Sequence, residues 1–559
     1  MKYNIQYIFL FIFLLLIGCK NKNSTKLFKN GMVVSAKVEA SNAGVEILKI
    51  GGNAFDAMIA TDLALSVVYP NAGNLGGGGF MVYRLSSGDN GTLDFREKSP
   101  LSSFENMFLD KLGNEIPNLS TKGALAVAVP GTIAGLFEVY RKFGSTPIEL
   151  IFEPAIQLAE NGYKLTANQA QSLNNNRKEI IELNGFLDLF KNKFNEGDLF
   201  VNKALGKTLR RILKNGKDEF YKGETAIEIV NYLSKKGGIV KLEDLSIYKP
   251  VWRSSLEIEY KDLKIITMGP PSSGGVVLGQ ILKMIEPFDL STLSHNSEEY
   301  IQLLTESERR SFADRSKYLG DPDFNYIPVN ELLDENYIKS RMDDFTFERA
   351  TQSISVSYGN LSLLESNETT HYSIADAMGN LVSVTTTLNG NYGSKLFPPN
   401  LGFFLNNEMD DFSKKPGLPN MYGLIGGKVN SIQPEKRMLS SMTPTIVEKN
   451  NKPFLVLGSP GGPTIITSVL QTILNVNDFK FNIQKSVDLP RFHHLWLPDK
   501  IFYENDLLNS EIENSLIEKG YKLNTKPNVI GRVDAIYIDQ DGNLFGGADK
   551  RGDDKSIGF

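Results

Sequence analysis

The stretch ETTHYSIADAMGNLVSVTTTLN, residues 368–389, contains two runs in which apolar and polar residues alternate. Gly379 and Asn380 separate the runs, and a Gly-Asn pair in this position is typical of a β-hairpin turn. Thr369 and Thr370 stand directly ahead of the first run. A surface hairpin that carries β-branched residues would show the same pattern, so alternation alone gives these threonines no chemical role.

The chain beyond this hairpin repeats the same texture. Alternating runs around an Asn-Asn and an Asp-Gly pair predict two further hairpins, at 443–462 and 533–547. Residues 463–478, PTIITSVLQTILNVND, have the pattern of a helix. The last third of the chain is therefore predicted to be mainly antiparallel sheet.

The residues before the hairpin predict more helix than sheet. Two helices are expected within 40–70, the second amphipathic, and 131–339 reads as mainly helical, with strands at 81–85 and 91–100. The glycines of NAGNLGGGGF, 71–80, miss both phosphate-binding motifs, so they predict a loop that lets backbone approach a ligand or another strand. Helices followed by hairpins predict a layered α/β (α+β) fold, an αββα sandwich.

The composition favours a small-molecule partner. The 60 Lys and Arg residues nearly balance the 65 Asp and Glu residues, and no basic block or basic-aromatic run occurs. A nucleic-acid partner therefore has no electrostatic support. A chain of 559 residues is long enough for two lobes or one large layered domain that buries its active site.

The N-terminus indicates export. Lys2 precedes an apolar run at 7–17 that has the length of a signal-peptide core, and LIGC follows at 16–19. LLIGC resembles a bacterial lipobox, which predicts a signal peptide at 1–18, a lipidated Cys19 and a polar tether over 19–35, with the protein anchored to a bacterial membrane outside the cytoplasm. A plain secretory signal with a chance cysteine is the alternative. Cys19 is the only cysteine, which excludes an internal disulfide or a thiolate metal cluster.

Two common catalytic arrangements lack their signatures. His493 and His494 are adjacent, and neighbours on a strand point to opposite faces, so a structural role is expected for the pair rather than a metal site. A serine hydrolase elbow of the form G-x-S-x-G would place glycine where LGSPGG has Leu457.

A threonine at the head of a strand suggests a different nucleophile. If the chain is cut just before it, the hydroxyl gains its own α-amino group as base. An α-amino group titrates near about 7.7 to 8.0, whereas a lysine at about 10.4 would need a shift of almost 3 units. The same hydroxyl can attack the preceding carbonyl and make the cut. The pattern alone does not choose between Thr369 and Thr370.

Several ordered segments are specific enough to identify a family. They are GGNAFDAMIATDLALSVVYPNAGNLGGGGF, LDFREKSP, VPGTIAGL, GPPSSGG, ETTHYSIADAMGNLVSVTTTLN, LNNEMDDFSKKPGLPNMYGLIGG, RMLSSMTPTIV, GSPGGPTIITSVLQ and PRFHHLWLPD. Together they resemble the γ-glutamyltranspeptidases, or glutathione hydrolases, over nearly the whole chain after residue 30. The resemblance implies an N-terminal-nucleophile hydrolase that is cut between Glu368 and Thr369 into a large subunit, 36–368, and a small subunit, 369–559, which stay together as one folded domain.

The resemblance also implies roles for single residues. Thr369 would be the nucleophile, Thr387 would hydrogen-bond it, and Gly461 and Gly462 would offer backbone N–H groups to the oxyanion. Without the family match, Arg96 or Asp411 alone would read as solvated surface charges. A γ-glutamyl group has a free carboxylate and a free ammonium, so the expected binding residues are Arg96, Ser440 and Ser441 for the carboxylate and Asn389, Glu408 and Asp411 for the ammonium.

The Pro- and Gly-rich segment after Asp411 matches the lid loop of the family, with Tyr422 expected to close over the substrate. The predicted function is that of a γ-glutamyltransferase and glutathione hydrolase that uses no metal or organic cofactor and passes the γ-glutamyl group to water, an amino acid or a peptide. Two alternatives remain open. One is an acylase of the same fold that acts on a glutaryl-type or other amide, and the other is an uncut, non-catalytic lipoprotein that binds amino-acid-like ligands.

Overall fold

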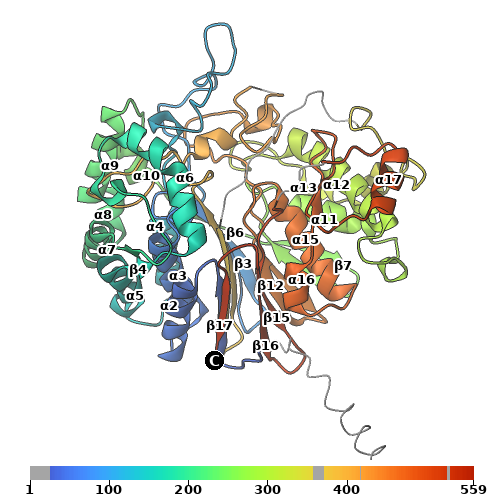
Figure 1. Ribbon diagram of the computed structural model, residues 1–559, viewed down its shortest axis with the longest axis horizontal. Coiled ribbons are helices and arrows are strands. Elements are labelled where there is room, and N and C mark those ends of the chain that lie inside the picture. Colours follow the sequence, from blue (N-terminus) through green and yellow to red (C-terminus); the bar gives the residue numbers. More distant parts are fainter. Residues whose placement is uncertain (1–25, 357–369, 416, 525–528) are drawn as a thin grey trace, which may run out of the picture.

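Two antiparallel sheets stacked face to face form the centre of the molecule (Figure 1). The computed structural model describes residues 26–356, 370–415, 417–524 and 529–559. The seven-stranded sheet has the order β17 (Lys555–Gly558), β1 (Gly31–Ser35), β9 (Thr370–Asp376), β10 (Leu381–Thr387), β2 (Gly78–Arg84), β3 (Asn90–Asp94) and β6 (Val251–Arg253). The six-stranded sheet has the order β16 (Leu544–Ala548), β15 (Asp534–Ile538), β12 (Lys452–Gly458), β11 (Thr445–Lys449), β8 (Leu263–Thr267) and β7 (Leu256–Tyr260).

Helices cover the outer face of each sheet (Figure 1). The seven-stranded sheet carries α2 (Val38–Lys49), α3 (Ala54–Val68), α4 (Thr132–Phe143), α5 (Ile148–Asn161), α6 (Ala167–Asn184), α7 (Lys203–Asn215), α8 (Lys217–Tyr221), α9 (Glu224–Lys235) and α10 (Leu242–Ile247). The six-stranded sheet carries α11 (Gly274–Ile285), α12 (Glu298–Tyr318), α13 (Val329–Leu332), α14 (Glu335–Arg341), α15 (Thr464–Asn477), α16 (Ile483–Asp488) and α17 (Ser510–Glu518). The predicted αββα sandwich is confirmed.

Two small two-stranded sheets and several short 3-10 helices complete the secondary structure. The small sheets pair β4 (Tyr163–Lys164) with β5 (Leu199–Phe200) and β13 (Phe492–His493) with β14 (Phe502–Tyr503). The 3-10 helices are η1 (Ala124–Ala126), η2 (Asp188–Phe190), η3 (Leu290–Thr292), η4 (Glu408–Asp411) and η5 (Lys428–Asn430).

Strand periodicity divides the apolar residues between the layers. In β1, Met32 and Val34 face the second sheet, while Val33 packs with the helices on the other side. In β11, Ile446 faces the first sheet, while Val447 joins the core beneath α11 and α12. Successive side chains on a strand point to opposite faces, so each strand contributes to two layers at once.

Both sheets mix strands from either side of position 369. β9 and β10 pair with each other and lie between β1 and β2, which come from the first part of the chain. In the second sheet β8 pairs with β11. The two predicted subunits therefore share both sheets, and a cut between them would not separate two independent cores.

Three details differ from the sequence-based expectations. β6, β7 and β8 lie within the region predicted to be mainly helical. Every residue of α3 is buried, so this helix is not amphipathic; it packs against β9 and β10 of the sheet and against the neighbouring helices α2, α4 and α5. The tether predicted over 19–35 is too long, because Gly31–Ser35 forms β1, an interior strand of the sheet.

The glycine loop at 71–80 was expected to approach either a ligand or another strand, and its backbone approaches a strand. A Cβ on Gly77 would lie 2.0 Å from the carbonyl oxygen of Thr387, so only glycine fits there. Asn74 fixes the loop, because its Nδ2 donates to the same carbonyl at 2.8 Å. The end of β10 is therefore held by backbone contact with this loop.

Glu368, Thr369, Cys19 and the predicted signal peptide lie outside the described residues. Among the helices that are described, none is both long and apolar enough to cross a membrane.

Candidate active site

A small cavity lies where β10 ends, and the predicted site residues converge on it. Its volume is about 20 Å³, which is little more than the space of one water molecule. The lining includes nine residues expected from the sequence: Arg96, Thr387, Asn389, Glu408, Asp411, Tyr422, Ser440, Ser441 and Gly462. Leu424, Met442 and Ile465 complete the wall. We call this space the inner cavity.

Arg96 is held by carboxylates inside the protein. It follows β3 and its side chain is only 1% exposed. Its Nη1 lies 2.7 Å from Glu408 Oε2, and its Nη2 lies 2.6 Å from Asp411 Oδ2. Glu97 is a third neighbour, with Oε2 3.6 Å from Nη1. Both carboxylate oxygens of Glu97 lack a hydrogen-bond partner among the described residues.

This cluster has more carboxyl groups than cations. Burial opposes the charge of Arg96, but Glu408, Glu97 and Asp411 outweigh it and raise its pKa. Burial raises the pKa of the Glu408, Glu97 and Asp411 carboxyls, although Arg96 lowers each of them. Arg96, even with the charge of Arg315 acting on Asp411, cannot balance three ionised carboxylates in a buried site, so the cluster retains protons or takes up another cation. An ammonium group would meet that need.

Ser440 and Ser441 lie in a tightly bonded segment beside α11. The Ser440 carbonyl accepts from Ser273 Oγ at 2.7 Å, and Ser441 Oγ accepts from Arg315 Nη2 at 3.3 Å. Arg315, from α12, also donates to Ser273 Oγ at 2.9 Å. Burial lowers the pKa of Arg315 to about 10, so it stays charged at neutral pH. This second buried arginine beneath the serines was not predicted.

Thr387 and Asn389 form a compact turn at the end of β10. The Asn389 N–H donates to Thr387 Oγ1 at 2.7 Å, so this hydroxyl keeps its own proton for another acceptor. Asn389 has φ +71°, a left-handed conformation that asparagine tolerates better than most residues. β9 begins at Thr370, which pairs with Thr386. The start of β9, directly after the predicted nucleophile, therefore lies beside Thr387.

Gly461 and Gly462 turn the chain between β12 and α15 with φ angles of +130° and +53°. A Cβ on Gly461 would lie 2.4 Å from Thr464 Oγ1. Among the described residues, neither N–H donates a hydrogen bond. Gly462 lines the inner cavity, while Gly461 lines a neighbouring one. Two backbone amides without hydrogen-bond partners among the described residues, next to a small polar cavity, suit the binding of a developing oxyanion.

Tyr422 closes the inner cavity. Its side chain packs on Gly462, where an added Cβ would lie 2.8 Å from Tyr422 Cδ1, and its hydroxyl donates to the carbonyl of Asn389. Asn420 ties this lid to the cluster, because its Nδ2 donates to Asp411 Oδ1 at 2.8 Å and its Oδ1 accepts from the Tyr422 N–H at 2.9 Å. Asn420 was not among the predicted site residues, and Glu97 also was not.

The adjacent histidines turn to separate partners. His493 Nδ1 lies 3.0 Å from Thr467 Oγ1. His494 Nδ1 accepts from the Trp496 N–H at 3.0 Å, and its other ring nitrogen lies 3.3 Å from Asp499. Both histidines are fully buried, as a structural role requires.

The family model of the gamma-glutamyltranspeptidases matches residues 40–559. A glutathione hydrolase proenzyme from Escherichia coli is 42% identical to this chain over 95% of the chain and 92% of the relative. One from Bacillus subtilis is 37% identical, again over 95% and 92%. An acylase proenzyme from a Pseudomonas strain is 32% identical over 96% and 94%.

Solved structures give the same result. A crystal structure of a cephalosporin acylase from Bacillus halodurans superposes with a TM-score of 0.84 at 25% identity and covers 97% of this chain and 98% of that one. A crystal structure of the Helicobacter pylori gamma-glutamyltranspeptidase is 42% identical, with a TM-score of 0.58, and covers 62% of this chain and 99% of that one. With the family model and these relatives spanning almost the whole sequence, the chain belongs to the gamma-glutamyltranspeptidase family.

Proposed function

We propose that this chain is a self-processed γ-glutamyltransferase and glutathione hydrolase. One observation carries the proposal. A single small cavity brings the buried Arg96 cluster together with Thr387 and Gly462, at the point where β9 begins. Membership of the family and the names of the similar glutathione hydrolase proenzymes support it.

Processing is proposed to cut between Glu368 and Thr369, giving a large subunit that ends at Glu368 and includes β1, and a small subunit, 369–559. The Thr369 hydroxyl attacks the Glu368 carbonyl, and water hydrolyses the resulting ester. The freed α-amino group then serves as the base for the same hydroxyl, because a pKa of about 8 leaves a useful fraction of it neutral at physiological pH. Since both sheets contain strands from either side of the cut, the two pieces remain associated.

The Arg96 cluster is proposed to bind the γ-glutamyl group by exchanging partners. The substrate α-carboxylate would take a bidentate position on Arg96, supported by Ser440 and Ser441. The carboxyls of Glu408 and Asp411, and the side chain of Asn389, would then receive the α-ammonium. The surplus of carboxyl groups favours this exchange, because the ammonium replaces retained protons as the balancing positive charge.

The reaction itself is proposed to proceed in two steps through an ester. Thr369 Oγ attacks the γ-carbonyl while Thr387 hydrogen-bonds Thr369. The N–H groups of Gly461 and Gly462 stabilise the oxyanion. The amine leaves with a proton from the α-ammonium group of Thr369, which took that proton from the threonine hydroxyl. Water, an amino acid or a dipeptide then attacks the ester and releases the γ-glutamyl group. We expect no metal or organic cofactor, so activity should persist in the presence of a chelator.

The location is proposed from the N-terminus. Removal of residues 1–18 would leave a lipidated Cys19 that anchors the enzyme to a bacterial membrane, on the side that faces away from the cytoplasm. Because β1 begins at Gly31, the tether available to the anchor is shorter than residues 19–35.

The direct test is release of glutamate from glutathione by the purified protein, with and without a dipeptide acceptor, followed by chromatography. Glutamate alone indicates hydrolysis, and a γ-glutamyl dipeptide indicates transfer. The similar acylases favour one alternative, an acylase acting on another amide. A glutaryl amide lacks the α-ammonium, so hydrolysis of the glutaryl amide but not of glutathione would reject the proposal in favour of that alternative.

A further inference from the structure

Two neighbouring cavities lie along α16 and β16. The larger has a volume of about 930 Å³ and the smaller a volume of about 700 Å³. Asn482, the residue before α16, lines both, and none of their lining residues lines the inner cavity. The larger one reaches Lys26 and Phe28, where the described part of the chain begins. We call the two cavities together the basic groove.

The basic groove is strongly positive, although the whole chain has a net charge of −5. Its charged lining residues are seven lysines and two aspartates. Lys449 is the one lysine of the seven that is paired, with Asp262 at 2.9 Å. The other six are exposed, and none has an ion-pair partner within the described part of the chain: Lys26, Lys452, Lys480, Lys485, Lys550 and Lys555.

The two aspartates of the lining do not offset these lysines. Asp488 accepts from Gln484 Nε2 at 3.1 Å, and Asp539 accepts from Asn543 Nδ2 at 2.8 Å. Each carboxylate is therefore bonded to a neighbour in its own segment. A ligand in the groove meets six ammonium groups without a carboxylate partner, which suits a surface that carries many negative charges.

Apolar side chains lie among the lysines. Phe28, Phe481 and Tyr537 are half-buried in the lining, and Lys485 Nζ lies 3.6 Å from the centroid of the Phe481 ring. Leu27, next to Lys26, is 48% exposed. Lysines mixed with apolar residues are typical of protein surfaces that bind the interface of an anionic bilayer.

The chain enters the fold at this groove. Phe28 is fixed to the edge strand β16, because its N–H donates to the Leu544 carbonyl at 3.1 Å and its carbonyl accepts from the Leu544 N–H at 2.8 Å. Cys19 precedes Lys26 by seven positions, and seven residues span about 25 Å at most. A lipid on Cys19 therefore keeps the groove within that distance of the bilayer.

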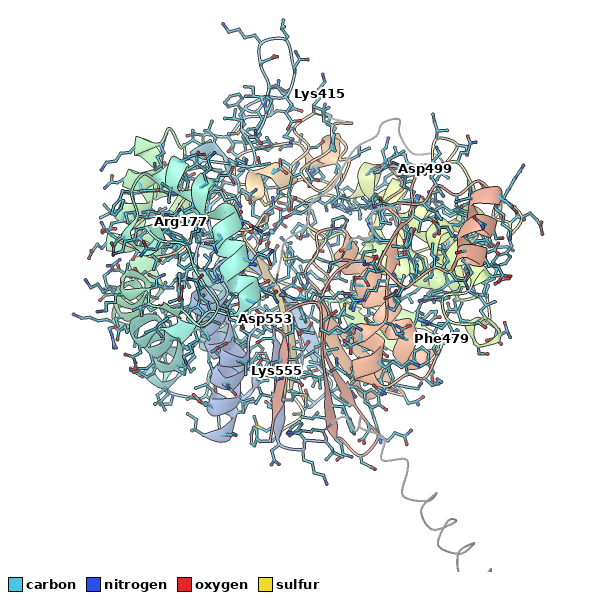
Figure 2. The ribbon with its side chains drawn as sticks, in the orientation of Figure 1. Arg177, Lys415, Phe479, Asp499, Asp553 and Lys555 are labelled. Carbon is cyan, nitrogen blue, oxygen red and sulfur yellow. The ribbon has the colours of Figure 1, made fainter. Side chains whose placement is uncertain are left out.

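The inner cavity lies at the other end of the first sheet. Thr370 pairs with Thr386 at that end, whereas Asp376, at the far end of β9, pairs with Gly31. A strand of this length spans about 20 Å. Figure 2 shows Lys415, near the start of the lid, at the top of the molecule and Lys555 below the middle. An enzyme that rests on the groove therefore keeps its inner cavity away from the bilayer.

We propose that the basic groove docks on a bilayer that contains anionic phospholipids, with its six lysines against the lipid phosphates. The inference rests on the proposed function for one element, the lipid on Cys19 that brings the groove to the bilayer. The lipid holds the enzyme at the membrane, and the groove determines which face of the enzyme turns toward it. A second copy of the chain is a poorer occupant, because a two-fold interface would place these lysines against one another.

The first test is vesicle binding by the mature chain from Lys20 onward without its lipid, which retains every described residue. We expect binding at low salt to vesicles of phosphatidylglycerol and phosphatidylcholine in equal parts, and release at high salt. Lys485→Gln/Lys550→Gln should weaken this binding at least about tenfold. Equal affinity for vesicles of phosphatidylcholine alone would overturn the proposal.

A matched double variant separates the groove from net charge. Lys178→Gln/Lys222→Gln removes two exposed lysines from the helices that cover the first sheet. It should bind vesicles as the wild type does, and both double variants should unfold at the wild-type temperature. Equal losses of binding in the two double variants would contradict the proposal. A wild-type dimer that dissociates in Lys485→Gln/Lys550→Gln would instead assign the groove to a second copy.

The lipidated full-length product tests the docking in place. In the same two kinds of vesicle, we expect acetylation of Lys485 and Lys550, followed by mass spectrometry, to be severalfold slower when phosphatidylglycerol is present. Lys178 should react at the same rate in both. Equal rates at Lys485 and Lys550 would overturn the proposal. A product without lipid on Cys19 would reject the proposed anchor instead, and the binding of the unlipidated chain would still decide whether the groove docks.

Discussion

Arg96 and Glu408 meet in the interior of the protein, with Nη1 2.7 Å from Oε2 and side chains that are 1% and 0% exposed. The two residues come from opposite sides of position 369, so the pair joins the two predicted subunits. In the absence of substrate, carboxyl groups of the protein occupy the guanidinium that we assign to the substrate carboxylate. Substrate binding is therefore an exchange of ion pairs inside a nearly closed site.

Arg96→Lys should impair binding although it keeps the positive charge. Lysine lacks the planar fork that contacts Glu408 and Asp411 at once, and it cannot pair bidentately with a substrate carboxylate. We expect the KM for a γ-glutamyl anilide to rise about 10- to 100-fold. Arg141→Lys, at an exposed arginine paired with Glu138, is the matched control. An unchanged KM in Arg96→Lys would argue against the proposed carboxylate site.

The pH dependence of binding should follow the carboxyl cluster. Burial raises the pKa of Glu408, Glu97 and Asp411, so these groups take up protons as the pH falls while still above the usual carboxyl range. A protonated carboxyl binds an ammonium poorly, so the KM should rise as the pH falls. Because the charge of Glu97 raises the pKa of Glu408, Glu97→Gln should move the inflection of the KM profile to lower pH. A profile that does not move would contradict this assignment.

Gly462→Ala should disturb the lid more than the backbone. The new Cβ would lie 2.8 Å from Tyr422 Cδ1, at a residue with φ +53°. We expect kcat/KM for glutathione to fall by at least about tenfold, because a displaced Tyr422 no longer closes the site. Gly216→Ala introduces the same side chain at φ +70° with no atom within 4 Å. It therefore tests the cost of the conformation alone, and equal losses in both variants would rule out the lid explanation.

Asp62 should make the stability of the protein depend on pH. It is buried in α3, accepts from the Tyr372 hydroxyl at 2.7 Å, and burial raises its pKa to about 7. The folded state then binds a proton that the unfolded state releases near about pH 4, so stability is greatest below that pH and falls as the pH rises to about 7. The loss amounts to about 4 kcal/mol at most. Asp62→Asn should remove this loss, which unfolding in urea at pH 5 and pH 8 would measure. A wild type whose stability falls no more than that of Asp62→Asn would contradict the expectation.

Much of the fold was predictable because its local signals agree. The hairpin of β9 and β10 has Gly-Asn at its turn, and the later hairpins have Asn-Asn and Asp-Gly. The hairpin of β7 and β8 was missed because its turn contains Lys261 and Asp262, and Lys261 adopts φ +51° without the usual glycine or asparagine.

The site was predictable only in part, for a physical reason. The family motifs identified the nine lining residues. Nothing in the sequence distinguishes Glu97 and Arg315 from ordinary surface charges. α12 contains many charged residues, yet most of it is buried, because it packs on α11 and also contacts α17, β13 and η5. Burial of a charge depends on partners far away in the chain, such as Asp411 beside Arg96, and no local pattern records them.

The central claim is that Thr369 becomes the N-terminus of a fragment and carries the γ-glutamyl group. Mass spectrometry of the protein, quenched in acid during turnover of glutathione, tests both parts. The account predicts a fragment that begins at residue 369 and gains the mass of one γ-glutamyl group, and a single uncut, unmodified chain for Thr369→Ala. Active protein that is continuous across positions 368 and 369, or a γ-glutamyl group on another residue, would contradict it.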